Sequence, residues 1–265
     1  MKHLPLMTIF LLLFGCEEDS GYAKVDLRGV DLAPVGDTVI QGDIDEPDAP
    51  CADTTSTNVI CDPFGDDDVI PESSNSGLHA KIYEGQAQWY QLDRYFTEGV
   101  ERTEDIYFSN FNVPSRSFSQ GFGTDGEYLK DRNGERLVEW FAIRARGFIS
   151  LPASESDGSY HLVTISDDGI KVTVDGTVVI SNPGAHAPTI DCGQTLTVLT
   201  KATKKTFELQ YFQGPREHIA LMTFIKKVDD ASTFQRASYC STTNGPSALL
   251  DDGYKVISPD YFTFR

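Results

Sequence analysis

Apolar and polar residues alternate with a period of two in short segments through the middle and C-terminal two-thirds of the chain. The segments are rich in β-branched and aromatic side chains and are bounded by Gly, Pro, Asn or Asp, a pattern typical of strands joined by turns. The predicted strands are residues 79–83, 105–111, 139–149, 160–166, 170–174, 177–180, 194–199, 206–213 and 219–226. Short strands at this spacing predict an all-β fold, an antiparallel β-sandwich.

One hairpin and one acidic corner are the clearest local features. Asp175 and Gly176 separate residues 170–174 from residues 177–180, and such a pair supplies the positive φ angles that a two-residue hairpin needs. Asp167 and Asp168 stand at the other end of the first of these strands. Paired carboxylates at a strand terminus offer hard oxygen ligands, so this corner is a candidate site for a divalent cation.

Residues on both sides of this corner resemble the protective-antigen-type domain, the β-sandwich of bacterial toxins, glycosidase accessory modules and yeast flocculins. The motifs that carry the resemblance are Gly121-Phe122, residues 141–149, Pro152-Ala153, Gly158-Ser159-Tyr160, the Asp167-Asp168-Gly169 corner, Asn182-Pro183-Gly184 and Leu209-Gln210-Tyr211-Phe212. The resemblance covers roughly residues 78–228. It departs from the family pattern where Glu155-Ser156-Asp157 lengthen a loop, and where Pro183 precedes the glycine.

The resemblance implies a calcium site at the corner. In sugar-binding members of the family, two adjacent aspartates joined by a cis peptide hold a calcium ion that coordinates sugar hydroxyls, which implies this role for Asp167 and Asp168. Asn182 is a candidate for a further ligand, because calcium takes six to eight oxygens. Gln213, a planar amide beside an aromatic pair, is a candidate for sugar contact. The alternative is structural, with one aspartate capping backbone N–H groups at the turn.

The first residues predict export. Met1-Lys2-His3 precede an apolar run over residues 4–14, which is shorter than the ~20 residues of a membrane-spanning helix. We interpret residues 1–15 as a signal peptide. Leu13-Phe14-Gly15-Cys16 resembles a bacterial lipobox, which implies a lipid on Cys16 and a place in the bacterial cell envelope, at the outer membrane. An ordinary secretory signal is the alternative.

Charge is concentrated in residues 16–76. The chain carries a formal charge of −18, and residues 17–76 hold 16 acidic and 2 basic residues, or −14 of it. With five prolines between residues 34 and 71 and few aromatics, this composition cannot bury enough apolar area to offset chain entropy. It predicts a disordered acidic tether. No basic stretch suits phosphate contacts, so nucleic acid is not an expected partner.

Five cysteines fit an exported, lipid-anchored protein. If Cys16 is lipidated, then Cys51, Cys61, Cys192 and Cys240 form an even set that predicts two disulfides. Four cysteines allow three pairings. We favour Cys51 with Cys61 and Cys192 with Cys240, and cross-links between tether and sandwich stay open.

The catalytic motifs of common hydrolases and nucleotide-binding enzymes are absent from the sequence. We expect no enzymatic activity. The predicted organisation is a signal peptide (1–15), a tether (16–76), the sandwich domain (77–228) and a C-terminal extension packed on it (229–265). The expected function is calcium-dependent glycan binding in adhesion. The alternative is a structural envelope lipoprotein whose sandwich binds a protein partner, with Asp167 and Asp168 merely architectural.

Overall fold

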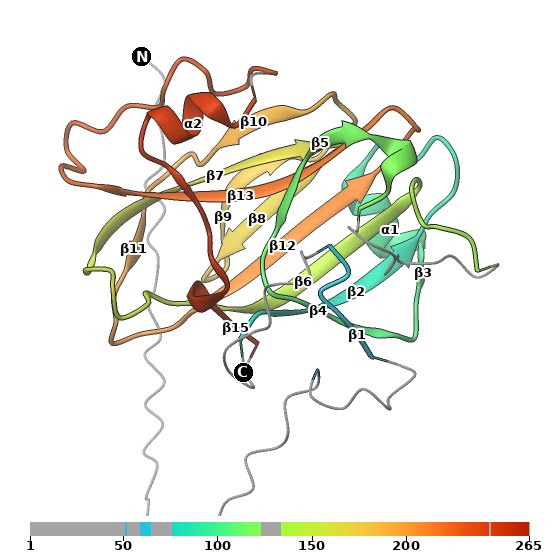
Figure 1. Ribbon diagram of the computed structural model, residues 1–265, viewed down its shortest axis with the longest axis horizontal. Coiled ribbons are helices and arrows are strands. Elements are labelled where there is room, and N and C mark those ends of the chain that lie inside the picture. The colour runs from blue at the N-terminus through green and yellow to red at the C-terminus, as the bar shows by residue number, and fades with distance from the viewer. Residues whose placement is uncertain (1–50, 52–58, 65–75, 123–133, 244, 265) are drawn as a thin grey trace, which may run out of the picture. The chain divides into compact units, whose positions relative to one another are not determined.

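Two β-sheets packed face to face form the folded part of the chain (Figure 1). The computed structural model describes residues 51, 59–64, 76–122, 134–243 and 245–264, all within the compact unit Asp45–Arg265. The predicted all-β sandwich is therefore confirmed. The signal peptide, Cys16 and most of the tether lie outside the described residues. Across the described ranges, no helix is long and apolar enough to span a membrane.

The larger sheet runs in the order β1-β4-β2-β6-β12-β8-β9, with β3 beside β2 and β15 beside β6. Its strands are β1 (Val59–Cys61), β2 (Leu78–Glu84), β3 (Val100–Glu101), β4 (Asp105–Phe108), β6 (Phe141–Ile149), β8 (Ile170–Val174), β9 (Thr177–Asn182), β12 (Lys205–Gln213) and β15 (Phe262–Thr263). All pairs in this sheet are antiparallel except β1 with β4, which is parallel.

The smaller sheet runs in the order β10-β7-β13-β14, with β11 beside β7 and β5 beside β13. Its strands are β5 (Asn112–Ser117), β7 (Gly158–Asp167), β10 (Thr189–Cys192), β11 (Thr197–Leu199), β13 (His218–Val228) and β14 (Lys255–Val256). The helical elements are α1 (Leu92–Glu98), α2 (Ser247–Asp251) and two short 3-10 turns, η1 (Phe118–Gln120) and η2 (Pro259–Tyr261).

The core lies between the sheets and follows the strand alternation. Phe141, Ile143 and Ala145 of β6 are fully buried in it. Part of the opposite face of β6 is buried as well, because α1 lies against β6 and β12 and covers Ala142, whereas Arg146 on this face is exposed. Tyr95 of α1 stacks on Phe212 with ring centroids 5.2 Å apart. The helix therefore gives the larger sheet a second buried face near the end of β12.

The chain joins the sandwich earlier than the boundary at residue 77 that its composition predicts. Residues of β1 pair with β4, and Phe64 is buried against Phe108 and Phe122. A disulfide links Cys51 to Cys61 at the end of β1. Residues 59–64 thus bury apolar area although the acidic segment around them does not predict it.

The C-terminal extension contributes a strand to each sheet. β14 pairs with β13, and β15 pairs with β6. The second disulfide joins Cys192 in β10 to Cys240, so both disulfides have the favoured pairing. Leu249 of α2 and Tyr254 pack on the outer face of the smaller sheet. This face is therefore buried too.

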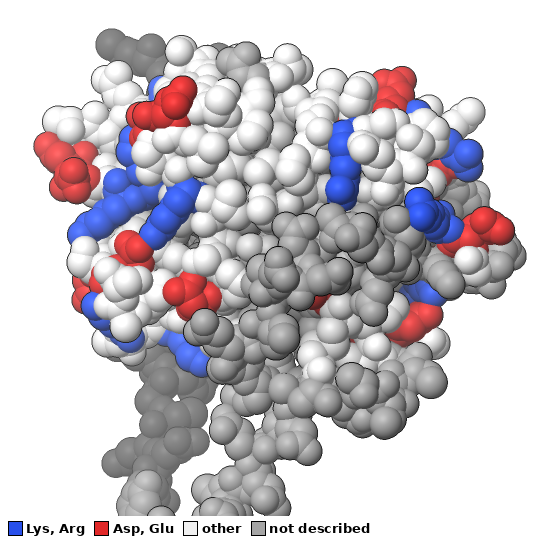
Figure 2. Space-filling view, viewed as in Figure 1, with Lys and Arg blue, Asp and Glu red and all other residues white. Residues whose placement is uncertain are grey.

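Acidic and basic side chains are interspersed on the face of the molecule that Figure 2 shows. Neither sign covers a continuous area there.

Candidate functional site

The turn between β7 and β8 contains the acidic corner. The Asp167–Asp168 peptide bond is cis, as the resemblance implies. Position 169 requires glycine, because a Cβ atom there would lie 2.4 Å from Cε1 of Phe212 and 2.8 Å from the carbonyl oxygen of Gly184. The corner is therefore packed tightly against β12 and against the loop that follows β9.

Asp168 fastens the loops that follow β9 and β12 to the corner. Its side chain is 3% exposed, and both carboxylate oxygens accept backbone hydrogen bonds. Oδ1 accepts from the N–H of His186 at 3.0 Å, and Oδ2 accepts from the N–H of Gly214 at 2.7 Å. Hydrogen bonds to an ionised acceptor are about twice as strong as neutral ones. This is the capping role that the sequence left open, and each oxygen keeps a further lone pair for a metal.

Asp167 is buried without a compensating positive charge. Its carbonyl oxygen accepts a hydrogen bond from the hydroxyl of Tyr211 at 2.5 Å. Burial, and then the charges of Asp168 and Glu217, raise the pKa of Asp167 to about 8, against a lowering hydrogen bond with Gln213. Burial also raises the pKa of Asp168. Among the described residues, neither carboxylate forms an ion pair with Lys or Arg.

The donor set at the corner fits calcium. Two adjacent buried carboxylates resist ionisation together, and a divalent cation bound by these residues would favour the ionised forms. No group of three or more His, Cys, Asp or Glu residues is gathered for a metal within the described ranges. Main-chain carbonyls or water would therefore have to supply the remaining ligands, which calcium accepts readily.

The two predicted amide ligands have other partners. Gln213 is fully buried; its Oε1 lies 2.6 Å from the Tyr211 hydroxyl, which shares its one proton with the carbonyl of Asp167, and its Nε2 donates to the carbonyl of His218 at 3.0 Å. Gln213 therefore stabilises the loop after β12 from its buried side. Asn182 donates from Nδ2 to Oδ1 of Asp191 at 3.0 Å. The structure thus brings Asp167, Asp168 and Gln213 together but turns the Asn182 amide to a different carboxylate.

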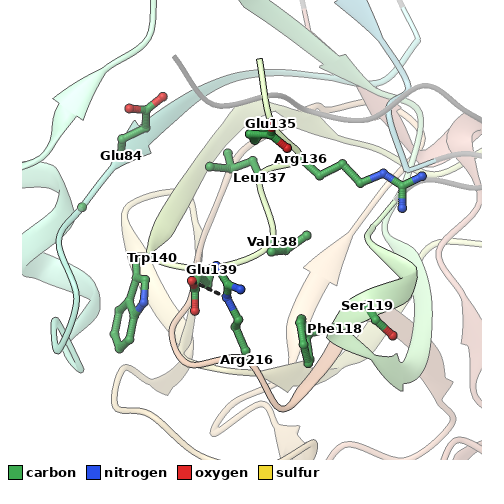
Figure 3. Close-up of a pocket in the computed structure, with 11 residues that line it drawn as sticks. Glu84, Phe118, Ser119, Glu135, Arg136, Leu137, Val138, Glu139, Trp140 and Arg216 are labelled. Carbon is green, nitrogen blue, oxygen red and sulfur yellow. Dashed lines mark hydrogen bonds and ion pairs between the residues drawn. The ribbon is translucent and has the colours of Figure 1, made fainter. Parts of the chain in front are cut away.

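A cavity of about 690 Å³ lies beside the loop that Asp168 fastens (Figure 3). Its walls combine aromatic, apolar and charged side chains from four segments of the chain. The lining residues are Glu84, Gly85, Phe118, Ser119, Glu135, Arg136, Leu137, Val138, Glu139, Trp140 and Arg216. Figure 3 shows the ion pair of Arg216 Nε with Glu139 Oε1, at 2.5 Å, lying between Trp140 and Phe118.

The cavity and the acidic corner share the loop after β12. Oδ2 of Asp168 accepts a hydrogen bond from the N–H of Gly214, and the carbonyl of Gly214 accepts one from the N–H of Trp140 at 3.4 Å. Arg216 lies two residues further along and lines the cavity. Neither Asp167 nor Asp168 lines this cavity. Asp168 is therefore connected to the cavity through this loop.

Trp140 has an uncommon backbone conformation for a bulky residue, with φ 57°. Two backbone hydrogen bonds hold it, one to Gly214 and one from the N–H of Gly85 to its carbonyl at 2.8 Å. The exposed ring of Tyr90 meets the Trp140 ring edge to face, with centroids 5.7 Å apart. Such conformations persist where the surroundings over-determine them, often at ligand sites.

Sequence reasoning did not identify this cavity. It placed Trp140 inside a strand over residues 139–149, whereas β6 begins at Phe141 and Trp140 belongs to the preceding loop. The left-handed conformation depends on contacts with Gly85 and Gly214, which are far away in sequence. No local pattern of residue types encodes it.

No known family model matches the chain, and no curated protein matches it. Among solved structures, it is similar to a PA14 sugar-binding domain from an RTX adhesin, with 16% identity, coverage of 72% of this chain and 99% of that one, and a TM-score of 0.46. It is also similar to the epithelial adhesin 6 A domain from Candida glabrata in complex with Galb1-3GlcNAc, with 11% identity, coverage of 75% and 90%, and a TM-score of 0.47.

A third similar structure is an anti-sigma factor domain-containing protein, with 14% identity and a TM-score of 0.44. The match covers 72% of this chain and 48% of that protein, so the chain spans about half of its length. With TM-scores below 0.5 and identities of 16% or less, these similarities say nothing of what this chain binds.

Proposed function

We propose that this chain is a non-catalytic, glycan-binding lipoprotein of the bacterial cell envelope, attached to the outer membrane through Cys16. The glycan occupies the cavity that Trp140 and Arg216 line. Calcium at Asp167 and Asp168 orders the loop after β12, which connects the acidic corner to this cavity. The observation that carries the proposal is this cavity of about 690 Å³ beside a loop fastened by a buried carboxylate. Its volume lies within the roughly 300–1,000 Å³ of small-molecule sites.

The side chains of the cavity suit a sugar. An aromatic ring such as that of Trp140 offers a flat apolar face for the C–H face of a pyranose. Glu84 and Glu139 provide acceptors for hydroxyl groups, and Arg216 provides donors. The Tyr90 contact and the two backbone hydrogen bonds of Trp140 position the ring before a ligand arrives. Such preorganisation reduces the entropy cost of binding.

Calcium supports this arrangement through charge. When bound, it would supply the positive charge that Asp167 and Asp168 lack and hold both carboxylates ionised. An ionised Asp168 is the stronger acceptor for the N–H groups of His186 and Gly214. Order in the loop after β12 then fixes Arg216 at the cavity. Glycan affinity should therefore fall when calcium is removed.

A glycan array with and without calcium tests the proposal, using two matched variants. Arg216→Gln removes a cavity guanidinium whose side chain is 60% exposed and paired with Glu139. Arg146→Gln removes one that is 61% exposed and paired with Glu208 on another surface. We expect Arg216→Gln to weaken glycan binding about tenfold or more, since hydrogen bonds to charged groups contribute ~1.5–3 kcal/mol. Arg146→Gln should bind as the wild type does.

Calorimetric titration of the chelated full-length chain with calcium tests the corner separately. We expect one binding event in the wild type and in Asp229→Asn, an exposed aspartate outside the corner, and none in Asp167→Asn. Glycan binding that is unchanged by chelation would contradict the proposed role of calcium, but the cavity would remain the proposed glycan site. Absence of any glycan binding, with Arg216→Gln indistinguishable from Arg146→Gln, would instead favour an envelope lipoprotein that binds a protein partner.

A further inference from the structure

A second, smaller cavity lies between β9 and β10. Its volume is about 290 Å³, and it shares no lining residue with the larger cavity. The lining is mostly polar and consists of Ile180, Ser181, Asn182, Thr189, Asp191, Cys192, Gln194, Arg236 and Ser241. The volume lies at the lower end of small-molecule sites, which suits a ligand about the size of an amino acid.

Asp191 is the unusual member of this lining. Its side chain is 8% exposed because β10 pairs with β7 and places Asp191 opposite Thr164, inside the sandwich. Oδ1 accepts the hydrogen bond from Asn182, and the Ser166 hydroxyl on β7 is a second neutral donor to the carboxylate.

Burying a charged carboxylate is costly, and buried charges in proteins are ordinarily paired. Burial raises the pKa of Asp191 despite the nearby charges of His186 and Arg236. Among the described residues, no Lys or Arg forms a direct ion pair with this carboxylate.

Arg236 gives the same cavity a positive charge. Its Nη1 donates to Oε1 of Gln194 at 3.1 Å, which engages one of the five N–H donors of the guanidinium. Arg236 and Asp191 line one cavity without forming an ion pair with each other. The two opposite charges are thus separated, and each has capacity for a ligand group.

The wall that carries Arg236 is anchored to β10. The Cys192–Cys240 disulfide ties it covalently. Two backbone hydrogen bonds add to this, from the N–H of Ser241 to the carbonyl of Ile190 at 2.7 Å and from the N–H of Ile190 to the carbonyl of Thr242 at 2.9 Å. The cavity is therefore a built site with walls held in place, rather than a gap between two loose segments.

We propose that this cavity binds a small zwitterion whose ammonium group pairs with Asp191 and whose carboxylate pairs with Arg236. A free amino acid is the chemical class that carries both charges at this size. An ammonium supplies a directly bonded positive charge for the Asp191 carboxylate, and a carboxylate accepts two N–H groups from a guanidinium. A neutral sugar would leave the carboxylate charge uncompensated. A lone metal ion would meet a single carboxylate here, against the several oxygens that metals require.

Calorimetric titration of the purified full-length chain tests this inference. Glycine, β-alanine and γ-aminobutyrate are zwitterions with increasing separation between the charges, while methylammonium and acetate each carry only one of them. We expect saturable binding of at least one zwitterion at millimolar concentration. Methylammonium and acetate should each bind about tenfold more weakly or not at all, because each can form only one of the two ion pairs.

Two variants and two controls complete the test. Asp191→Asn keeps an acceptor for Asn182 but removes the charge, and Arg236→Gln changes an exposed side chain. Each should weaken zwitterion binding about tenfold or more, whereas Asp229→Asn and Arg146→Gln, both exposed, should not. The inference is overturned if no zwitterion binds at millimolar concentration. It is also overturned if methylammonium binds as tightly as the zwitterion and Arg236→Gln has no effect.

Discussion

Replacement of Asp167 by Asn should stabilise the calcium-free protein at neutral and alkaline pH. Asn has nearly the same shape, and the Tyr211 hydroxyl bonds to the backbone carbonyl of residue 167, so this contact survives. What changes is charge: the wild-type carboxyl is 4% exposed, lies beside Asp168 and has its pKa raised to about 8. Because Asn does not ionise, the variant avoids the free-energy cost of a buried negative charge at this position.

The pH dependence follows from the two protonation states. Below the ordinary value of 3.8, Asp167 is protonated in the folded and unfolded chains, and the variant gains nothing. Between pH 3.8 and about 8 the folded chain keeps a proton that the unfolded chain releases, so the free energy of unfolding decreases as pH rises. At ~1.36 kcal/mol per pKa unit, the full penalty above pH 8 is on the order of 5 kcal/mol. Net stabilities are ~5–15 kcal/mol, so the effect is large.

Thermal unfolding in chelator from pH 4 to pH 9 measures it. The melting temperatures of wild type and Asp167→Asn should agree near pH 4 and separate by about 10 °C or more by pH 8, at ~2–4 °C per kcal/mol for a domain of this size. Asp229→Asn should follow the wild type. Calcium should raise the wild-type melting temperature at pH 8 and leave Asp167→Asn unchanged. A difference between the two proteins that stays constant across the whole pH range would refute the reasoning.

Three further outcomes are expected. Replacing Cys192 and Cys240 with Ser opens a loop of 48 residues and should lower the free energy of unfolding by about 4 kcal/mol, as measured by urea denaturation. Burial lowers the pKa of His161, so its stabilising contribution is complete above pH 6.5 and is lost as pH falls below that value; melting curves at pH 5 and 7 should show this loss in the wild type and not in His161→Gln. Cys16→Ser should abolish incorporation of a clickable fatty acid in cells, and a wild type that takes up no label would contradict the lipid anchor.

The sequence predicts strands well both where one face is buried, as in β8, and where both faces are buried, as in β7 and β13. Residues 170–174 form β8 as predicted, because their alternation matches one core. Residues 105–111 form no single strand: β4 ends at Phe108, and β5 begins at Asn112 in the other sheet. Local alternation does not record a change of sheet. The sequence also does not predict β10 (Thr189–Cys192), because its Ile190 and Cys192 pack outward against the distant C-terminal extension.

The acidic corner could be read from the sequence because its residues are contiguous. Asp167 and Asp168 lie together whatever surrounds them, and the structure adds only which groups they contact. The two cavities could not be read, because they depend on long-range contacts. Arg216 meets Glu139 across 77 positions in the chain, and Arg236 meets Gln194 across 42. The pairing of strands determines which distant residues come into contact. The local alternation of apolar and polar residues does not predict these contacts.

One loop connects the acidic corner with the smaller cavity. The N–H of His186 is held by Asp168, and the imidazole of His186 counteracts the burial that raises the pKa of Asp191. Asn182, at the start of this loop, is bonded to Asp191. A cation at the corner and a zwitterion at Asp191 would thus act on the same ten residues. Any effect of one ligand on the affinity of the other must be reciprocal. The affinity for the zwitterion is measured with and without calcium, and the affinity for calcium with and without the zwitterion. The two ratios must give the same coupling factor. If neither ligand changes the affinity for the other, the loop does not couple the two sites.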